Sequence, residues 1–374
     1  MQEEKKCCRM AAGGNRMEIL FGICMVKSRY GEDDSYGRHL GAFLGRMGCR
    51  VSQLDITSEN SPREMANGKF SPGLIHGFHL VKSGLICQNI AIAARLPFII
   101  TCTGTDVFVD LQTPGLNESV RSVLESAERV VVPTSAMLPY LREVIPDYRR
   151  FSVIPKGVEI PTGMIPPDFK GSGIETQDRV VLLPGPILPV KNTLFAMQSM
   201  GPLISRIPNL KLVLIGNLLD SEFGKSVKDL MAAQPWIVHL QEPPEEQMAL
   251  WYKRAEVVIN VSHAEGGCQN LLEAMSLGMP VLASDIPGNR GYIIDETDVS
   301  GKGTGFLYSA SPSLAGFQRI HEREDFCKRL EFILRHPEIR HETGKRAAEW
   351  VKKYLNPELE AFLYMELYRE LTGV

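Results

Sequence analysis

Two acidic residues and two glycines stand together in the stretch EVVINVSHAEGGCQNLLEAMSLGMPVLASDIPGN, residues 256–289. Glu265, Gly266 and Gly267 follow a strand-like run and come just before an expected helix. Glycines at this point let a ligand approach the backbone N–H groups at the positive end of the helix, where anions bind. Glu273 lies on that helix, and since carboxylates accept hydrogen bonds from hydroxyls, the pattern suits a sugar or a ribose. A tight turn with solvated carboxylates is the alternative interpretation of the same residues.

This stretch resembles the donor-site signature of glycosyltransferase family 4 and the related glycosyl transferases group 1. In that signature two glutamates separated by seven residues precede a helical alanine and a G-x-P-V-x-A-S strand. The matching residues here are Glu265, Glu273, Ala274 and GMPVLAS. Further matching segments follow the family order: IHGFH at 75–79, PFIITCTGTDV at 97–107, RVVVPTSAM at 129–137, VIPKGV at 153–158, and Gly185 with Lys191 in PGPILPVKN. The details GTDV and IPGN are similar to the glycosyltransferase 1 domain-containing subgroup.

The resemblance implies the GT-B fold, two Rossmann-like α/β domains with a cleft between them, and a retaining, metal-independent transfer from a nucleotide-sugar to an acceptor. It implies catalytic roles for Glu265, Lys191 and Asp106. The nucleotide-sugar contacts that it implies are Gly185, Lys191, Leu240, Glu265, Gly266, Gly267, Cys268, Gln269, Asn270 and Glu273. The acceptor-side residues are Gly31, His76, His79 and Thr103. We expect a UDP-sugar as co-substrate, no further cofactor, and a small molecule or a glycan as acceptor.

The loop that holds the donor diphosphate departs from the family pattern. The family uses an Arg and a Lys in a G-R-x-x-x-x-K loop, and here Gly185 and Lys191 match while Pro186 stands at the Arg position. A surface lysine at the start of a helix is the alternative interpretation of Lys191. Arg290, in PGNRG, is a candidate substitute for the missing cation.

A second departure lies in the first half of the chain, where the family's H-G-x-D motif reads TGTD at 103–106. Thr103 can exchange a hydrogen bond with a sugar but cannot carry positive charge. Asp106 follows a strand-like run, and open α/β sheets bind ligands at the carboxyl ends of their strands. A turn-capping Asp106 and structural roles for His76 and His79 are the alternatives.

Gly31 fits the glycine that the family has in its first loop, and three acidic residues follow it at 32–34. Carboxylates repel phosphate, so this loop favours an acceptor with hydroxyl or amino groups, unless it is simply a solvated acidic loop. Besides the glycosyltransferase, two other hypotheses remain open. One is a GT-B scaffold that binds a sugar nucleotide or a partner without turnover, and the other is an enzyme whose acceptor atom is not a hydroxyl oxygen.

The elements that must position these residues alternate along the whole chain, as an α/β fold requires. Strand-like runs occur at 17–26, 49–56, 73–76, 97–102, 129–133, 151–155, 179–184, 211–216, 237–240, 256–261, 280–283 and 305–308. A stretch rich in Pro and Gly separates two halves and is typical of an interdomain connection. The predicted divisions are an extension at 1–16, an acceptor domain at 17–160, a linker at 161–178, a donor domain at 179–352, and a helix at 353–374 that returns to the first domain.

Composition limits the class of partner. The 41 Lys+Arg against 44 Asp+Glu leave a net charge of −3, so nothing favours nucleic acid. The apolar stretch 85–102 is interrupted by polar residues and is not a membrane span, and residues 1–16 lack the apolar segment of a signal peptide. The eight cysteines lack the spacing of a metal site, and no D-x-D motif is present. We therefore expect a cytoplasmic protein without a bound metal.

Overall fold

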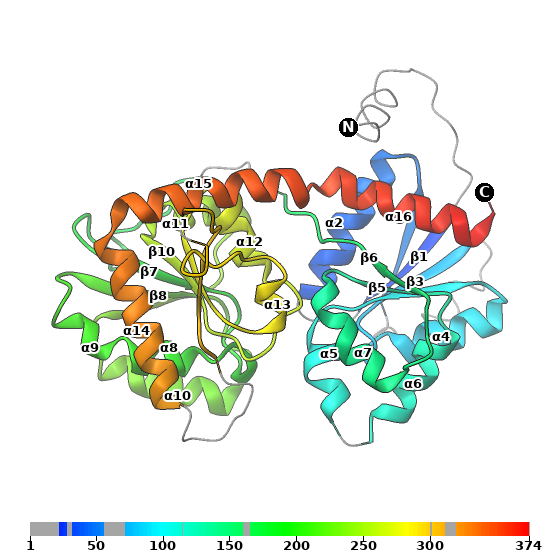
Figure 1. Ribbon diagram of the computed structural model, residues 1–374, viewed down its shortest axis with the longest axis horizontal. Helices are drawn as coiled ribbons and strands as arrows, with labels where there is room; N and C mark the ends of the chain where they lie inside the picture. Colours follow the sequence, from blue (N-terminus) through cyan, green and yellow to red (C-terminus); the bar gives the residue numbers. More distant parts are fainter. Residues whose placement is uncertain are drawn as a thin grey trace, which may run out of the picture.

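The computed structural model describes residues 22–27, 32–55, 72–113, 115–159, 165–299, 301–310 and 319–373. Its strands form two six-stranded sheets, and all the strand pairs are parallel. Parallel neighbours need crossover connections, and most of these contain a helix. Figure 1 shows the two α/β units side by side. The α/β fold class is confirmed, and each of the twelve strand-like runs overlaps one strand.

The first sheet has the strand order β2-β1-β3-β4-β5-β6. Its strands are β1 (Gly22–Lys27), β2 (Arg50–Asp55), β3 (Leu74–Phe78), β4 (Phe98–Thr101), β5 (Arg129–Val132) and β6 (Phe151–Val153). The accompanying helices are α2 (Glu32–Arg46), α4 (Gly84–Ala94), α5 (Thr105–Phe108), η1 (Asp110–Gln112), α6 (Asn117–Ser126), η2 (Ser135–Met137) and α7 (Leu138–Val144). β3 and β4 are buried along their whole length, which explains why they read as continuous apolar runs.

The second sheet has the order β12-β11-β10-β7-β8-β9. Its strands are β7 (Arg179–Pro184), β8 (Leu210–Ile215), β9 (Ile237–Leu240), β10 (Val257–Asn260), β11 (Val281–Ser284) and β12 (Phe306–Tyr308). The helices are η3 (Pro189–Lys191), α8 (Thr193–Ser199), α9 (Gly201–Ile204), α10 (Ser221–Ala232), α11 (Glu245–Arg254), α12 (Gln269–Ser276), α13 (Pro287–Arg290), α14 (Arg319–Arg335) and α15 (Pro337–Tyr354).

The last helix, α16 (Pro357–Thr372), joins the first sheet rather than the second. Asn356 caps it by accepting a hydrogen bond from the backbone N–H of Leu359, and Pro357 at its first position suits the start of a helix. Tyr364 and Tyr368 are buried in the same apolar cluster as Leu44 of α2. Figure 1 shows α15 along the second unit and α16 running on across the first. After α15 the chain therefore returns to the first unit, where α16 packs.

Candidate functional site

The order of the second sheet determines where its ligand-binding edge lies. The chain runs from β7 outward through β8 to β9 and then returns to β10 on the other side of β7. In open parallel sheets, the loops that follow two such neighbouring strands diverge and leave room for a ligand at their carboxyl ends. The loop after β7 carries Gly185 and Lys191, and the loop after β10 carries Glu265. Residues that lie 74 positions apart in the sequence are thus brought together.

Glu265 and Lys191 form an ion pair at this edge. Lys191 Nζ lies 2.9 Å from Glu265 Oε1, and the Glu265 side chain is buried. The same oxygen accepts hydrogen bonds from Ser262 Oγ at 2.6 Å and from Asn260 Nδ2 at 3.0 Å. A buried carboxylate needs partners of this kind, because an uncompensated charge away from water is costly. The three donors hold Glu265 in one position at the end of β10.

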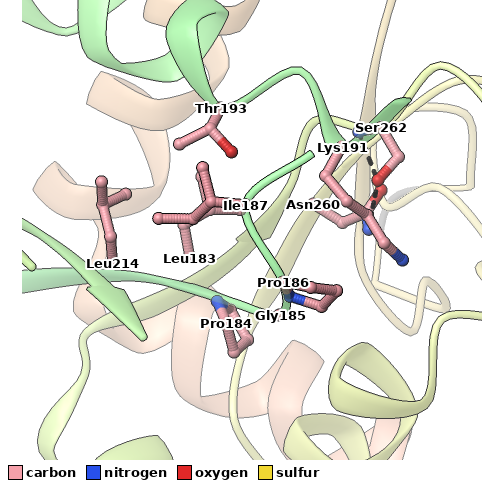
Figure 2. Close-up of a pocket in the computed structure, with 10 residues that line it drawn as sticks. All are labelled: Leu183, Pro184, Gly185, Pro186, Ile187, Lys191, Thr193, Leu214, Asn260 and Ser262. Atoms are coloured by element: carbon pink, nitrogen blue, oxygen red, sulfur yellow. Dashed lines mark hydrogen bonds between the residues drawn. The ribbon is translucent and has the colours of Figure 1, made fainter. Parts of the chain in front are cut away.

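The loop after β7 packs so closely against the loop after β8 that a side chain at Gly216 would clash with it. Gly185 has φ 120°, and a Cβ on Gly216 would lie 1.9 Å from the carbonyl oxygen of Gly185. Asn270, at the start of α12, lies next to the same loop. A small pocket opens beside it, which Figure 2 shows with polar Lys191, Asn260 and Ser262 on one side and apolar Leu183, Ile187 and Leu214 on the other.

Glu273 has a different environment from Glu265, one turn into α12. Its two oxygens accept hydrogen bonds from Tyr252 Oη at 2.8 Å and Gln269 Nε2 at 3.1 Å. Burial raises the pKa of the Glu273 carboxyl, while these two hydrogen bonds and the positive charge of Lys156 act in the opposite direction. These two hydrogen bonds use only part of the acceptor capacity of Glu273, because a carboxylate can accept about four hydrogen bonds.

The two units of the fold touch at this edge through backbone atoms. A Cβ on Gly104 would lie 2.1 Å from the backbone nitrogen of Gly266, and a Cβ on Gly266 would lie 2.0 Å from the carbonyl oxygen of Thr103. Beside this contact, Tyr292 Oη donates a hydrogen bond to the carbonyl oxygen of Pro133 at 3.2 Å. The loop after β4 and the loop after β10 are therefore in direct contact where the two units meet.

The two-unit α/β fold agrees with the family comparison. The model of glycosyl transferases group 1 matches residues 164–350, which is half of the chain. The chain belongs to this glycosyltransferase family. Among curated proteins, the glycosyltransferase 1 domain-containing protein 1 of Xenopus tropicalis is 26% identical over 366 residues, covering 95% of this chain and 98% of that protein. The D-inositol 3-phosphate glycosyltransferase of Segniliparus rotundus is 26% identical over 186 residues, covering 46% of this chain and 40% of that protein.

Solved structures with a similar fold are also glycosyltransferases. Sucrose-phosphate synthase from Thermosynechococcus elongatus superposes with a TM-score of 0.77 at 19% identity, over 94% of this chain and 99% of that one. The Anabaena protein HepE, in complex with UDP and glucose, superposes with a TM-score of 0.76 at 13% identity, over 94% of this chain and all of that one. The glycosyltransferase therefore has the GT-B fold that its motifs predicted.

Asp106, for which the family motif predicted a catalytic role, is a structural residue in this glycosyltransferase. Its side chain is fully buried and accepts hydrogen bonds from the backbone N–H groups of Leu80, Thr103, Gly104 and Val107 at 2.7–3.2 Å. Both oxygens of the carboxylate are thus engaged by backbone donors. Asp106 instead fixes the backbone at Gly104, which contacts Gly266.

His76 was predicted on the acceptor side, but it lies in the core of the first unit. Its ring is fully buried between β4 and α16, with Nδ1 2.7 Å from Tyr368 Oη and Nε2 2.8 Å from Thr101 Oγ1. Burial lowers the pKa of His76 to about 3. Both ring nitrogens thus have protein partners, and the contact with Tyr368 ties α16 to the first sheet.

His79 is also a structural residue. It adopts a left-handed backbone conformation with φ 76°, and its Nδ1 accepts hydrogen bonds from the backbone N–H groups of Val81 and Lys82. Nε2 consequently carries the proton and donates to Thr105 Oγ1 at 3.2 Å. The ring closes the turn after β3 instead of lining the site. Gly31 lies outside the described residues.

The remaining predicted residues surround the loop contact. Thr103 lies at the contact itself, and its Oγ1 is enclosed without a hydrogen-bond partner among the described residues. Gly267 has φ 143° and packs against the ring of Tyr292, and Cys268 is buried as the residue before α12. Leu240 ends β9, where its carbonyl oxygen accepts a hydrogen bond from the backbone of Gly216.

The cation expected to replace the missing arginine has another partner. Arg290 forms a bidentate ion pair with Asp285, and its side chain is largely exposed. Pro186 contributes only an apolar ring to the pocket of Figure 2. One residue near the site had not been predicted: Tyr252, whose aromatic type gives no signal of its contact with Glu273.

Within the described ranges, no three His, Cys, Asp or Glu side chains gather in a group that could hold a metal ion. None of the helices among these residues is long and apolar enough to cross a membrane.

Proposed function

We propose that this chain is a retaining glycosyltransferase that moves a sugar from a nucleotide-sugar, with a UDP-sugar as the expected donor, to a small-molecule or glycan acceptor without a metal ion. The observation that carries the proposal is the Lys191–Glu265 pair beside the Gly104–Gly266 contact. It places a cation and a buried carboxylate where the two domains meet. HepE, which shares the fold, is described with UDP and glucose, and this supports uracil as the donor base.

In the proposed reaction, the bond between the anomeric carbon and the diphosphate oxygen breaks and the diphosphate leaves with the electron pair. The acceptor oxygen bonds to the anomeric carbon on the face that the diphosphate leaves, and its proton passes to the departing phosphate. Lys191 stabilises the negative charge that grows on the leaving group, the task that a metal performs in metal-dependent transferases. Glu265 stabilises the positive charge that grows on the sugar ring, and Glu273 accepts hydrogen bonds from the ribose hydroxyls.

A scaffold without turnover is the second candidate, and two observations favour it. Pro186 and Thr103 replace two polar family residues, and Arg290 is engaged by Asp285. An acceptor atom other than a hydroxyl oxygen is compatible with the enzyme proposal and leaves the donor chemistry unchanged.

One experiment separates these candidates. The protein is screened by thermal shift against UDP-, GDP- and ADP-sugars, and each donor that stabilises it is then incubated in EDTA while release of the free nucleotide is measured. The enzyme proposal predicts stabilisation by a UDP-sugar and nucleotide release that chelation does not abolish. Binding without release, even with a broad acceptor panel, supports the scaffold. Release that EDTA abolishes and Mn²⁺ or Mg²⁺ restores contradicts metal independence.

A further inference from the structure

Asn289, in the segment IPGN, lies two hydrogen bonds away from Glu265, and the proposed reaction gives it no role. It belongs to the short helix α13, and only 1% of it is exposed. Its amide nitrogen donates to the backbone carbonyl of Ser284 at 3.0 Å and to Asn260 Oδ1 at 3.1 Å. Because a carbonyl oxygen only accepts, the contact with Ser284 fixes which end of the Asn289 amide is the donor.

Asn260 passes this orientation on to Glu265. Its Oδ1 accepts from Asn289 and from the backbone N–H of Ser262 at 3.3 Å, so its amide nitrogen points the other way. That nitrogen donates to Glu265 Oε1 at 3.0 Å and to Ser262 Oγ at 3.2 Å. If the Asn260 amide turned over, its oxygen would face the carboxylate, and two acceptors would meet without a proton between them. Asn289 and the Ser262 N–H therefore hold Asn260 in the orientation that donates to Glu265.

All the protein donors reach the same oxygen of Glu265. Lys191, Ser262 and Asn260 each donate to Oε1. None of the described residues donates to Oε2, and this atom is not one of the fully enclosed polar atoms that lack a partner. The same three donor residues line the pocket shown in Figure 2. The hydrogen bonds thus leave Oε2 as the oxygen of Glu265 that is available to a ligand.

We propose that Asn289 is a positioning residue for Glu265: acting through Asn260, it keeps Oε1 bound to the protein and Oε2 turned toward the transferred sugar. This inference rests on the proposed function, since it assigns Oε2 to the positive charge that grows on the sugar ring. A carboxylate held in advance by fixed hydrogen bonds needs no reorganisation when that charge develops, whereas a carboxylate that rotates does. Asn289 should therefore affect turnover and leave nucleotide binding unchanged.

The test compares Asn289→Ala, Asn260→Ala and the double variant with wild type. Calorimetry measures UDP affinity, and the rate of nucleotide release at saturation is measured with UDP-glucose. Each single substitution should lower that rate about three- to tenfold, the value of one hydrogen bond, while UDP affinity stays within about twofold because UDP carries no sugar. The double variant should be no slower than Asn260→Ala, since Asn289 acts through that residue.

The control is Thr343→Val on α15. Thr343 is fully buried, and its hydroxyl accepts a hydrogen bond from Arg346 at 3.0 Å. The control variant loses a buried hydrogen bond, as Asn289→Ala does, but it should keep wild-type turnover and UDP affinity. Should Asn289→Ala not fold, Asn289→Ser, whose side chain ends one bond before the amide nitrogen, is read in the same way.

Three results would overturn the inference and leave the donor site in place. Wild-type turnover in Asn289→Ala would show that the residue does not position Glu265. A proportional fall of UDP affinity and turnover would show that Asn289 supports the fold of the whole site. Losses that multiply in the double variant would show that Asn289 acts independently of Asn260. If wild type releases no nucleotide from any UDP-, GDP- or ADP-sugar, the proposed function fails, and this inference with it, before a variant is tested.

Discussion

Lys191 and Glu265 lie 2.9 Å apart, although one follows β7 and the other follows β10. In the described structure each neutralises the other, and the buried carboxylate has two further donors in Ser262 and Asn260. A donor diphosphate would compete with Glu265 for the lysine. The pair thus gives the site a cation for the leaving group and a carboxylate for the sugar. Substituting Lys191 and substituting Glu265 should therefore affect donor binding and turnover differently.

Glu265→Gln should lower turnover more than donor affinity. The amide retains an oxygen for Ser262 but loses the charge that stabilises the developing positive charge on the sugar. We expect the rate of nucleotide release at saturation to fall at least about tenfold, or about 1.4 kcal/mol of activation free energy, while UDP affinity holds or rises because Lys191 gains a free charge. Steady-state kinetics and calorimetry measure the two effects. Unchanged turnover would exclude Glu265 from the reaction.

Glu273→Gln should give the opposite result. Its proposed contact with ribose hydroxyls is made equally in the ground and transition states, so its loss weakens donor binding without slowing the saturated enzyme. We expect KM for the donor to rise about five- to tenfold with kcat within about twofold. Glu246→Gln, an exposed residue in the first turn of α11, is the control. A fall in kcat with unchanged KM would place Glu273 at the reacting sugar instead.

Gly266→Ala tests whether the contact between the domains is part of the site. The added methyl would lie 2.0 Å from the backbone carbonyl of Thr103, so the two loops must separate. We expect turnover to fall at least about tenfold, because catalytic geometry is sensitive to displacements of about 1 Å. Gly45→Ala, at an exposed position of α2 where an added methyl meets nothing within 4 Å, should leave turnover unchanged. Equal activity of both variants would show that the contact is dispensable.

Much of the fold could be predicted because its determinants are local in sequence. Buried parallel strands are apolar along their whole length, so runs such as those at β3 and β4 indicate strands without any tertiary knowledge. Family motifs predicted Lys191 and Glu265 separately as site residues, but they did not predict the ion pair between them. Its geometry was beyond the sequence, since 74 residues separate the partners.

The sequence could not decide between ligand-facing and structural roles for polar residues whose partners are distant or belong to the backbone. An aspartate in a sequence motif looks identical in the sequence whether its carboxylate binds a ligand or accepts hydrogen bonds from the backbone. Asp106 accepts from four backbone N–H groups. His76 is enclosed by Tyr368, from a helix almost 300 residues later. Burial and contact, rather than residue type, decide such roles.

Glu360 should make stability depend on pH near neutrality. Burial raises the pKa of Glu360 to about 7, with Tyr36, the N–H of Gly157 and the charge of Lys156 acting in the opposite direction. A carboxyl whose pKa is raised on folding contributes stability below its unfolded pKa, and this is lost as pH rises through about 7. Glu360→Gln does not titrate, so its Tm relative to wild type should increase from pH 5 to pH 8, by an amount equivalent to roughly 2–3 kcal/mol. Thermal unfolding at several pH values measures this.

The control for that series is Glu366→Gln, an exposed residue of the same helix. Its Tm should follow wild type at every pH. A constant difference between Glu360→Gln and wild type across the range would show that Glu360 has the same charge throughout.

The central claim is that a nucleotide-sugar binds at Lys191, and calorimetric titration of UDP-glucose into wild type, Lys191→Ala and Lys345→Ala tests it most directly. Circular dichroism first establishes that Lys191→Ala is folded, because the substitution leaves Glu265 without its cation. We predict measurable binding to wild type, binding to Lys191→Ala that is at least about tenfold weaker, and wild-type affinity for Lys345→Ala. Only the Lys191 substitution removes a positive charge that would contact the diphosphate. Equal affinity of all three proteins for the donor, or no binding of any UDP-, GDP- or ADP-sugar to wild type, would contradict the account.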